Sequence, residues 1–147
     1  MNRRTLLGLS GAALAGLAGC NTYRNEQRAR NPRFAFAGVI VESLSTAEQY
    51  QPLSVTVSVE KDGAEIYQDD HTVQDVVHGE AFRVTGEWAE ERLPYSVTLS
   101  SSVHEPTTQT TAKLDADDER GRFSGTSLWF RFQLTANTIL FRPMPVK

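Results

Sequence analysis

The sequence predicts an all-β domain, a two-sheet β-sandwich that follows a cleaved signal peptide and a short tether. Three observations lead to this prediction. Apolar and polar residues alternate in several separate stretches, as in strands with one face in a core and one face in water. Turn-forming residues such as Asp62-Gly63 lie between these stretches. No stretch shows the sustained 3.6-residue apolar spacing of a helix.

The first half of the domain contains three expected strands. Residues Phe34 to Val41 are apolar on both faces, which predicts a deeply buried strand. From Leu53 to Glu60 the sequence reads Leu-Ser-Val-Thr-Val-Ser-Val-Glu, with every second residue apolar. Lys61-Asp62-Gly63 then predicts a hairpin turn, because Gly tolerates positive φ. Phe82 and Val84 mark a further strand by the same alternation.

The second half continues the pattern. Tyr95, Val97 and Leu99 alternate with small hydroxyl residues, and the Ser/Thr-rich run from Ser100 to Thr111 is expected to add an edge strand with a threonine face. Apolar residues also alternate through a later strand and mark a last one: Leu128, Phe130, Phe132, Leu134, Ile139 and Phe141. We expect the last strand to end where Pro143 and Pro145 interrupt pairing.

Short turns connect these strands. Gly121 and Gly125 bracket one turn region. Ser45-Thr46-Ala47-Glu48 has the spacing of a helix capping box, but Pro52 limits any helix there to a turn or two. Seven or eight short strands in one domain favour a two-sheet sandwich over other all-β folds.

Two segments resemble strands of immunoglobulin-like or fibronectin-type modules: Val55 to Val59, followed by Asp62-Gly63, and Tyr95 to Leu99. The resemblance implies an immunoglobulin-like sandwich. The Cys…Trp…Cys spacing of antibody-type domains is missing, because the chain has a single Cys. A transthyretin-like sandwich or a small barrel therefore stays open. Trp88 and Trp129 suit either the core or its rim.

Residues 1–19 have the features of an export signal. Arg3 and Arg4, followed by Thr5 and two leucines, match the twin-arginine pattern. The apolar stretch that follows is shorter than the roughly 20 residues needed to span a bilayer. Leu17-Ala18-Gly19-Cys20 matches a lipobox, in which the Cys sulfur takes a lipid and the chain is cut just before it. The alternative is an uncleaved N-terminal membrane helix.

The single cysteine agrees with this interpretation. An exported domain with one thiol has no internal disulfide, and lipidation of Cys20 would leave no free thiol in the mature protein. Residues 20–33 are almost free of apolar side chains and are expected to form a flexible basic tether, which reaches at most about 45 Å. Its arginines, Arg33 among them, either contact anionic headgroups or stay solvated. The sandwich is expected over residues 34–147.

Charge divides between these parts. Residues 1–33 hold six arginines and one acid, a net +5, whereas residues 34–147 hold nine basic and seventeen acidic residues, a net −8. An acidic domain argues against a nucleic-acid partner. With the Arg-rich, Lys-poor composition, the leader resembles those of lipoproteins of halophilic archaea. The resemblance implies export and anchoring to the outer face of the cytoplasmic membrane.

A search for sites of chemistry finds no motif that defines one. Gly121-Arg122-Phe123-Ser124-Gly125 has its Ser one position too late for a nucleophile elbow, so Ser124 is expected in a turn. Glu90 and Glu91 suit an exposed connection better than acid–base catalysis.

Metal ligands are also not indicated. The stretch from Asp69 to His78 matches no known ligand spacing. The run from Asp115 to Gly121 has acids at alternating positions, but Arg120 stands where a calcium loop needs Gly, so we expect a solvated acidic turn. We assign no metal and no cofactor. The residues that come nearest to an ion site are Asp115, Asp117 and Glu119.

The sequence therefore predicts a membrane-anchored, extracytoplasmic lipoprotein with a non-catalytic sandwich. Its partners are the membrane, through Cys20, and an envelope protein or glycan. The alternative is a lipoprotein that binds a small ligand or metal ion through the acidic turn or the region of His71. A hydrolase is a third hypothesis, which a cleft lined by Ser, His and Asp would revive.

Overall fold

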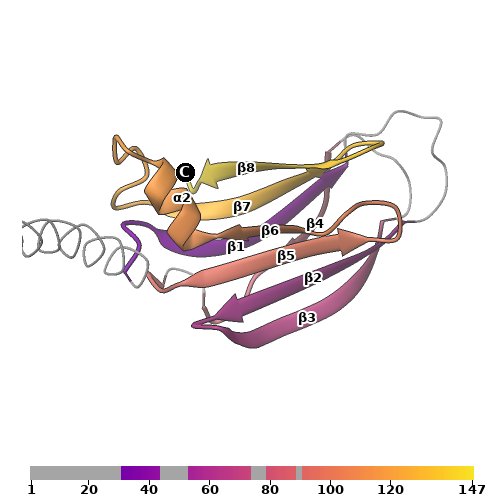
Figure 1. Ribbon diagram of the computed structural model, residues 1–147, viewed down its shortest axis with the longest axis horizontal. Helices are drawn as coiled ribbons and strands as arrows, with labels where there is room; N and C mark the ends of the chain where they lie inside the picture. The colour runs from indigo at the N-terminus through magenta and orange to yellow at the C-terminus, as the bar shows by residue number, and fades with distance from the viewer. Residues whose placement is uncertain (1–30, 44–52, 74–78, 89–90) are drawn as a thin grey trace, which may run out of the picture.

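Figure 1 shows the computed structural model, in which two four-stranded sheets pack face to face. It describes residues 31–43, 53–73, 79–88 and 91–147. Sheet A has the order β4-β1-β7-β8, and sheet B has the order β3-β2-β5-β6. The strands of sheet A are β4 (Gly79–Val84), β1 (Ala35–Ser43), β7 (Ser127–Leu134) and β8 (Ile139–Pro145). Those of sheet B are β3 (Ala64–Val73), β2 (Leu53–Lys61), β5 (Tyr95–Ser101) and β6 (Thr107–Thr110). The predicted all-β sandwich is confirmed.

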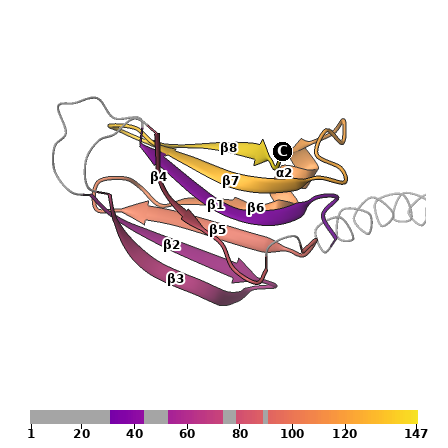
Figure 2. The same ribbon diagram turned by 180° about the vertical axis from the view of Figure 1, so that it is seen from behind.

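One short helix, α2 (Thr111–Asp117), joins sheet B to sheet A. The alternation of the sequence did not predict it, because seven residues are too few to show a 3.6-residue period. Figures 1 and 2 show α2, the start of β1 and the C-terminus at the same end of the sandwich. The expected sites Arg3, Arg4 and Cys20, and the capping box at 45–48, lie outside the described residues.

Strand β1 lies at the centre of sheet A and is buried on both faces, as its sequence predicts. It pairs antiparallel with β4 and parallel with β7. The register with β7 shifts between Phe36 and Gly38, so that both Phe36 and Val39 lie in the core. Gly38 has a φ of 141°, and a Cβ there would lie 2.5 Å from the carbonyl oxygen of Val84. Only glycine fits both conditions.

The Asp62-Gly63 turn joins β2 to β3 as expected. The φ angles of Asp62 and Gly63 are 51° and 79°, which is the double positive φ of a type I′ hairpin. Lys61 pairs directly with Ala64 across the turn. On β2, Val55, Val57 and Val59 are fully buried, which confirms the face predicted for this strand.

The prediction that Pro143 and Pro145 end the last strand is wrong, because both residues pair with β7. Backbone bonds join Thr135 N to Thr138 O and Val146 N to Ser127 O, each at 2.9 Å. In an antiparallel ladder hydrogen-bonded pairs alternate with non-bonded ones, so positions 139, 141, 143 and 145 direct their backbone groups away from β7. The two prolines therefore cost no hydrogen bond between β7 and β8. They also leave the open edge of β8 without two backbone N–H donors.

The core lies between the two sheets and is rich in aromatic rings. Phe36 lies 4.7 Å from Tyr95 and 5.1 Å from Phe130, measured between ring centroids. Tyr95 and Phe130 alternate with polar residues as predicted, and all three rings are buried. These contacts join the central strand of sheet A to sheet B, and they account for packing without a disulfide.

The edge strands β3 and β4 close one side of the sandwich. His71 of β3 stacks on Phe82 of β4, with ring centroids 4.1 Å apart and planes at 12°. The Tyr67 hydroxyl lies 2.9 Å from His71 Nε2, and its ring contacts Trp88. Trp88 therefore packs at the rim of the core, whereas Trp129 lies on the outer face of sheet A beneath Arg83.

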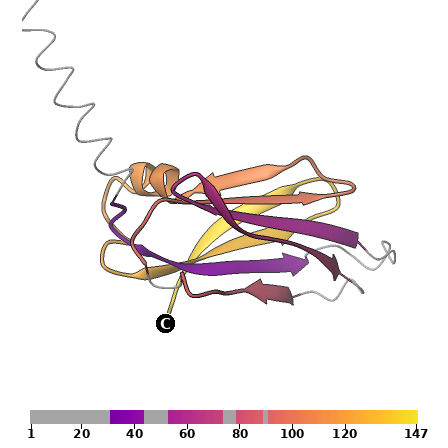
Figure 3. The same ribbon diagram turned by 90° about the horizontal axis from the view of Figure 1, so that it is seen from below.

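The strand order bears on the type of sandwich. In an immunoglobulin constant domain, strands 1, 2, 5 and 4 form one sheet. Here strand 1 pairs with strands 4 and 7, and strand 2 pairs with strands 3 and 5. The strand order therefore differs from the immunoglobulin one, and of the two predicted forms of the two-sheet sandwich the transthyretin-like one remains. Figure 3 shows the two layers from below.

Candidate functional site

The side of the sandwich opposite β3 and β4 is an open groove of about 500 Å³. It lies between the edge strands β6 and β8, with α2 and the 118–123 turn at one end. Its apolar floor comes from α2, the 118–123 turn and β8, and its polar or charged rim comes from β6, α2 and the same turn. The floor residues are Leu114, Phe123, Ile139, Leu140, Phe141 and Pro143. The rim residues are Thr107, Gln109, Lys113, Asp117 and Arg122, and the buried Asp118 lies beneath them.

Helix α2 is fixed at its N-terminus by two threonines. The Thr110 side chain accepts a hydrogen bond from Lys113 N at 3.0 Å and thus caps the helix. Thr111 is fully buried, and its Oγ1 accepts a hydrogen bond from Tyr95 N at 3.0 Å. These bonds hold the helix against the start of β5, so the groove keeps one fixed wall.

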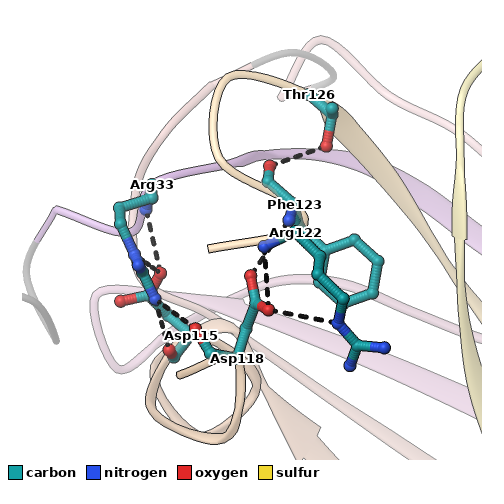
Figure 4. Close-up of polar contacts among 6 residues, drawn as sticks. All are labelled: Arg33, Asp115, Asp118, Arg122, Phe123 and Thr126. Atoms are coloured by element: carbon teal, nitrogen blue, oxygen red, sulfur yellow. Dashed lines mark hydrogen bonds and ion pairs between the residues drawn. The ribbon is translucent and has the colours of Figure 1, made fainter. Parts of the chain in front are cut away.

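Arg33 fixes the other end of α2, as Figure 4 shows. Its Nε donates to Asp115 Oδ1 at 2.9 Å. Its Nη2 donates to the carbonyl oxygens of Asp115 and Asp118 at 2.9 and 2.8 Å. The guanidinium therefore donates to two carbonyls at the helix end, of which that of Asp118 also accepts from Gly121 N at 3.0 Å. Arg33 O also accepts from Gly125 N at 2.8 Å.

These contacts correct the expectation for Arg33. The sequence predicts that Arg33 belongs to the flexible tether, where it contacts a headgroup or stays solvated. Its side chain is 29% exposed and is held by a partner 82 positions later in the chain. Ordered contacts therefore begin before the strand that opens at Ala35.

Asp118 organises the turn that follows α2. Its carboxylate accepts hydrogen bonds from Phe123 N at 2.9 Å and Arg122 N at 3.0 Å, as Figure 4 shows. The bond from the Phe123 backbone is the main reason that the pKa of Asp118 lies below its ordinary value of 3.8, with the bonds from Arg122 adding to it. The ionised carboxylate thereby fixes Phe123 in the groove floor.

The expectation of a solvated acidic turn is wrong for two of its residues. Asp115 and Asp118 are 1% and 3% exposed, because α2 directs them inward against Arg33 and the following turn. Asp117 and Glu119 are exposed and line a hollow of about 230 Å³ together with Arg120 and Arg122. Among the described residues, no three His, Cys, Asp or Glu side chains gather as metal ligands.

The histidines that the structure describes have structural partners. His71 stacks on Phe82, and Asp70 beside it accepts from Thr56 Oγ1 at 2.6 Å. His104 was not singled out as a site. Its Nδ1 lies 2.7 Å from Ser101 Oγ, and its Nε2 lies 2.6 Å from the carbonyl oxygen of Thr135. It thus ties the β5–β6 loop to the β7–β8 turn. Asp75 and His78 lie outside the described residues.

The serine and carboxylates considered for catalysis also have local roles. Ser124 lies in the predicted turn, where its N donates to Gly121 O at 3.1 Å. Glu91 accepts from Lys61 Nζ and from the Tyr95 hydroxyl, both at 2.7 Å. The bond from Lys61 is the main reason that the pKa of Glu91 is lowered. Burial, then the bond to Glu91, raise the pKa of Tyr95. Glu90 lies outside the described residues.

Fold and site together define a β-sandwich domain with one closed side and one grooved side. No family model matches the chain, and no characterised protein or solved structure is significantly similar to it. Within the described ranges, no helix is long and apolar enough to cross a membrane.

Proposed function

We propose that this protein is a lipid-anchored, extracytoplasmic lipoprotein whose non-catalytic sandwich binds a partner protein through the groove between β6 and β8. The leader supports the location, because Arg3, Arg4 and Cys20 have the order of a twin-arginine signal and lipobox. The groove carries the binding function, because an apolar floor inside a charged rim is the usual anatomy of a protein interface.

The groove favours recognition by side chains rather than by strand addition. Pro143 and Pro145 leave the edge of β8 without donors over its second half. An added strand would need those donors for its ladder. The aromatic rings of Phe123 and Phe141 instead offer the kind of surface that anchors apolar side chains of a partner.

Lys113, Asp117 and Arg122 give the rim charges of both signs. Mixed charges favour a protein segment over a uniformly charged polymer, because they can pair with both acids and bases of a partner. We therefore propose an envelope protein as the partner. Binding of a glycan in the groove would instead change the proposed class of partner.

Site-directed photo-crosslinking in native membranes tests the groove. A photoreactive amino acid replaces Gln109 on the groove rim, and the matched control replaces Gln68, which is exposed on β3 away from it. We expect a discrete protein adduct from position 109 and none from position 68. No adduct from position 109, the same adducts from both positions, or an adduct to glycan alone would contradict the proposed partner.

Fractionation tests the anchor separately. The parent chain is expected in the membrane fraction, and Cys20→Ser is expected to be released or left unprocessed with the sandwich still folded. Tight membrane association of a folded Cys20→Ser variant would instead favour the uncleaved helix. The two experiments are independent, so the absence of a crosslink in the groove would not change the result expected for the anchor.

A further inference from the structure

The outer face of sheet A carries a row of arginines that crosses the sheet. Ile40 pairs with Arg83 of β4 on one side and with Arg131 of β7 on the other, and Arg131 pairs with Arg142 of β8. Paired residues share a face of the sheet, so the three arginines lie in one line over four strands. The line spans about 14 Å, from the usual strand spacing.

The outer face of sheet B has the opposite character. Its outward positions on β2, β5 and β6 are mostly Ser and Thr. Its charged positions are acidic: Glu60 pairs with Glu65, and Asp70 pairs with Thr56. Sheet A also carries Glu42 and its register partner Glu80 beside the three arginines, so its outer face holds one positive charge in excess, whereas the charges on the outer face of sheet B are acidic. The sandwich is therefore electrically polar, although residues 34–147 carry a net charge of −8. An anionic surface would attract sheet A and repel sheet B.

The protein itself leaves Arg131 incompletely satisfied. Its Nε is buried without a hydrogen-bond partner. Its Nη1 lies 3.7 Å from Glu42 Oε1 and 3.9 Å from Met144 Sδ, which are long contacts for a guanidinium. Arg142 is exposed directly opposite Arg131, and like charges in that position destabilise a sheet. The buried Nε of Arg131 is out of reach of an external group, so the exposed guanidinium of Arg142 is the one that an external anion would neutralise.

We propose that the outer face of sheet A docks on the anionic phosphate headgroups of the membrane that holds the anchor. This inference rests on the proposed lipidation of Cys20. The tether enters the domain at β1, a central strand of this same sheet, and Arg33 fixes that entry point. Residues 20–33 reach at most about 45 Å, so the entry point of the domain stays within that distance of the bilayer.

The side chains of this face suit a headgroup layer. Guanidinium groups bind phosphate oxygens through two parallel hydrogen bonds. Arg83 covers the ring of Trp129 at 4.9 Å, and the buried side chain of Ile40 supports the row from below. A partly buried indole beside cations is typical of residues that settle at a membrane–water interface. Docking on sheet A would leave the groove between β6 and β8 beside the membrane plane and open to a partner.

The test uses the lipidated protein in vesicles and Trp129 as its reporter. The chain has two tryptophans, so Trp88→Phe leaves Trp129 alone. We expect phosphatidylglycerol vesicles to shield Trp129 from acrylamide, and phosphatidylcholine vesicles to leave it quenchable. Salt at about 0.5 M should weaken the shielding, because the screening length falls to a few Å, whereas hydrogen bonds between guanidinium and phosphate at contact distance should keep part of it. Arg131→Gln with Arg142→Gln should lower the docked-to-undocked ratio about 25-fold, at roughly fivefold per arginine.

Matched variants distinguish a loss of docking from a general loss of positive charge and from a loss of folding. Arg92→Gln with Arg120→Gln removes two exposed arginines elsewhere and should behave like the parent. Arg142→Gln alone removes an exposed side chain, so it tests the row without disturbing the buried part of Arg131. Equal quenching on both kinds of vesicle would overturn the proposal. Shielding by soluble polyphosphate but not by vesicles would overturn the membrane as the partner.

Vesicle flotation distinguishes a failure of the docking proposal from a failure of the anchor proposal. If Cys20 carries lipid, the parent and all arginine variants float with both kinds of vesicle. Flotation without shielding of Trp129 refutes docking and leaves the anchor intact. Loss of flotation on phosphatidylcholine refutes the anchor itself.

Discussion

Replacing Arg33 with alanine should destabilise the whole domain, although Arg33 lies outside every strand. The substitution removes the cation beside Asp115, whose side chain is 1% exposed. It also removes the donor to the carbonyl oxygens of Asp115 and Asp118 at the end of α2. The Asp115 carboxylate then loses its ion pair and keeps only the bond from the backbone N of residue 33, the Asp115 carbonyl loses its bond from the guanidinium, and the Asp118 carbonyl keeps only Gly121 N.

The magnitude follows from these contacts. Removing one partner of a buried ion pair costs about 3–5 kcal/mol, and a hydrogen bond to a charged group contributes about 1.5–3 kcal/mol. Because Arg33 is 29% exposed, water replaces part of what is lost, so we expect the lower end, about 3 kcal/mol. Asp115→Ala should cost less, because a partly exposed guanidinium can hydrate.

Urea unfolding of the full chain, followed by tryptophan fluorescence, measures this loss. With a slope of about 1–3 kcal/mol per molar, the midpoint for Arg33→Ala should fall by about 1–3 M. Arg120→Ala is the matched control, since Arg120 is exposed and should change stability by less than about 0.5 kcal/mol. A loss for Arg33→Ala no larger than that of Arg120→Ala would refute the role given to the Arg33–Asp115 pair.

Three further predictions concern other parts of the sandwich. Gly38→Ala should lower stability by about 2 kcal/mol or more, because its Cβ would meet the Val84 carbonyl oxygen at a residue with positive φ, and thermal unfolding measures this. Asp118→Asn should destabilise the domain at pH 7 and progressively less below about pH 4, because a lowered folded-state pKa stabilises only above the unfolded value. Changing Pro143 and Pro145 together to Ala should increase association of the folded protein, measured by light scattering.

One of these predictions has a control variant, and the other two have a result that would contradict them. Gly125→Ala introduces a Cβ with no atom within 4 Å, so its loss should be smaller than that of Gly38→Ala. A constant stability difference between the parent and Asp118→Asn down to pH 2.5 would contradict the linkage. An unchanged association state after both proline substitutions would show that the edge of β8 needs no protection.

The alternation of apolar and polar residues predicted strands because it can be recognised from neighbouring residues alone. The valines of β2 and the Asp62-Gly63 turn needed no knowledge of the rest of the chain. The fully buried β1 was likewise evident from its unbroken apolar run. Strand order was not predictable, because pairing β1 with β7 joins segments about 90 residues apart.

The site was less predictable for the same reason. The run of acids from Asp115 to Glu119 has the composition of a solvated turn, and its burial depends on Arg33, far earlier in the chain. The prolines of β8 were misinterpreted because their effect depends on which way each backbone group points in the ladder. The only local signal of α2 was the cap at Thr110, one residue inside a run expected to form an edge strand.

Intact-mass spectrometry of the protein extracted from native membranes tests the proposed anchor most directly. We predict a chain that begins at Cys20 and carries a lipid on its sulfur, with residues 1–19 removed. A chain that still begins at Met1, or one whose Cys20 is unmodified, would contradict the proposal that this sandwich functions as a membrane-tethered lipoprotein.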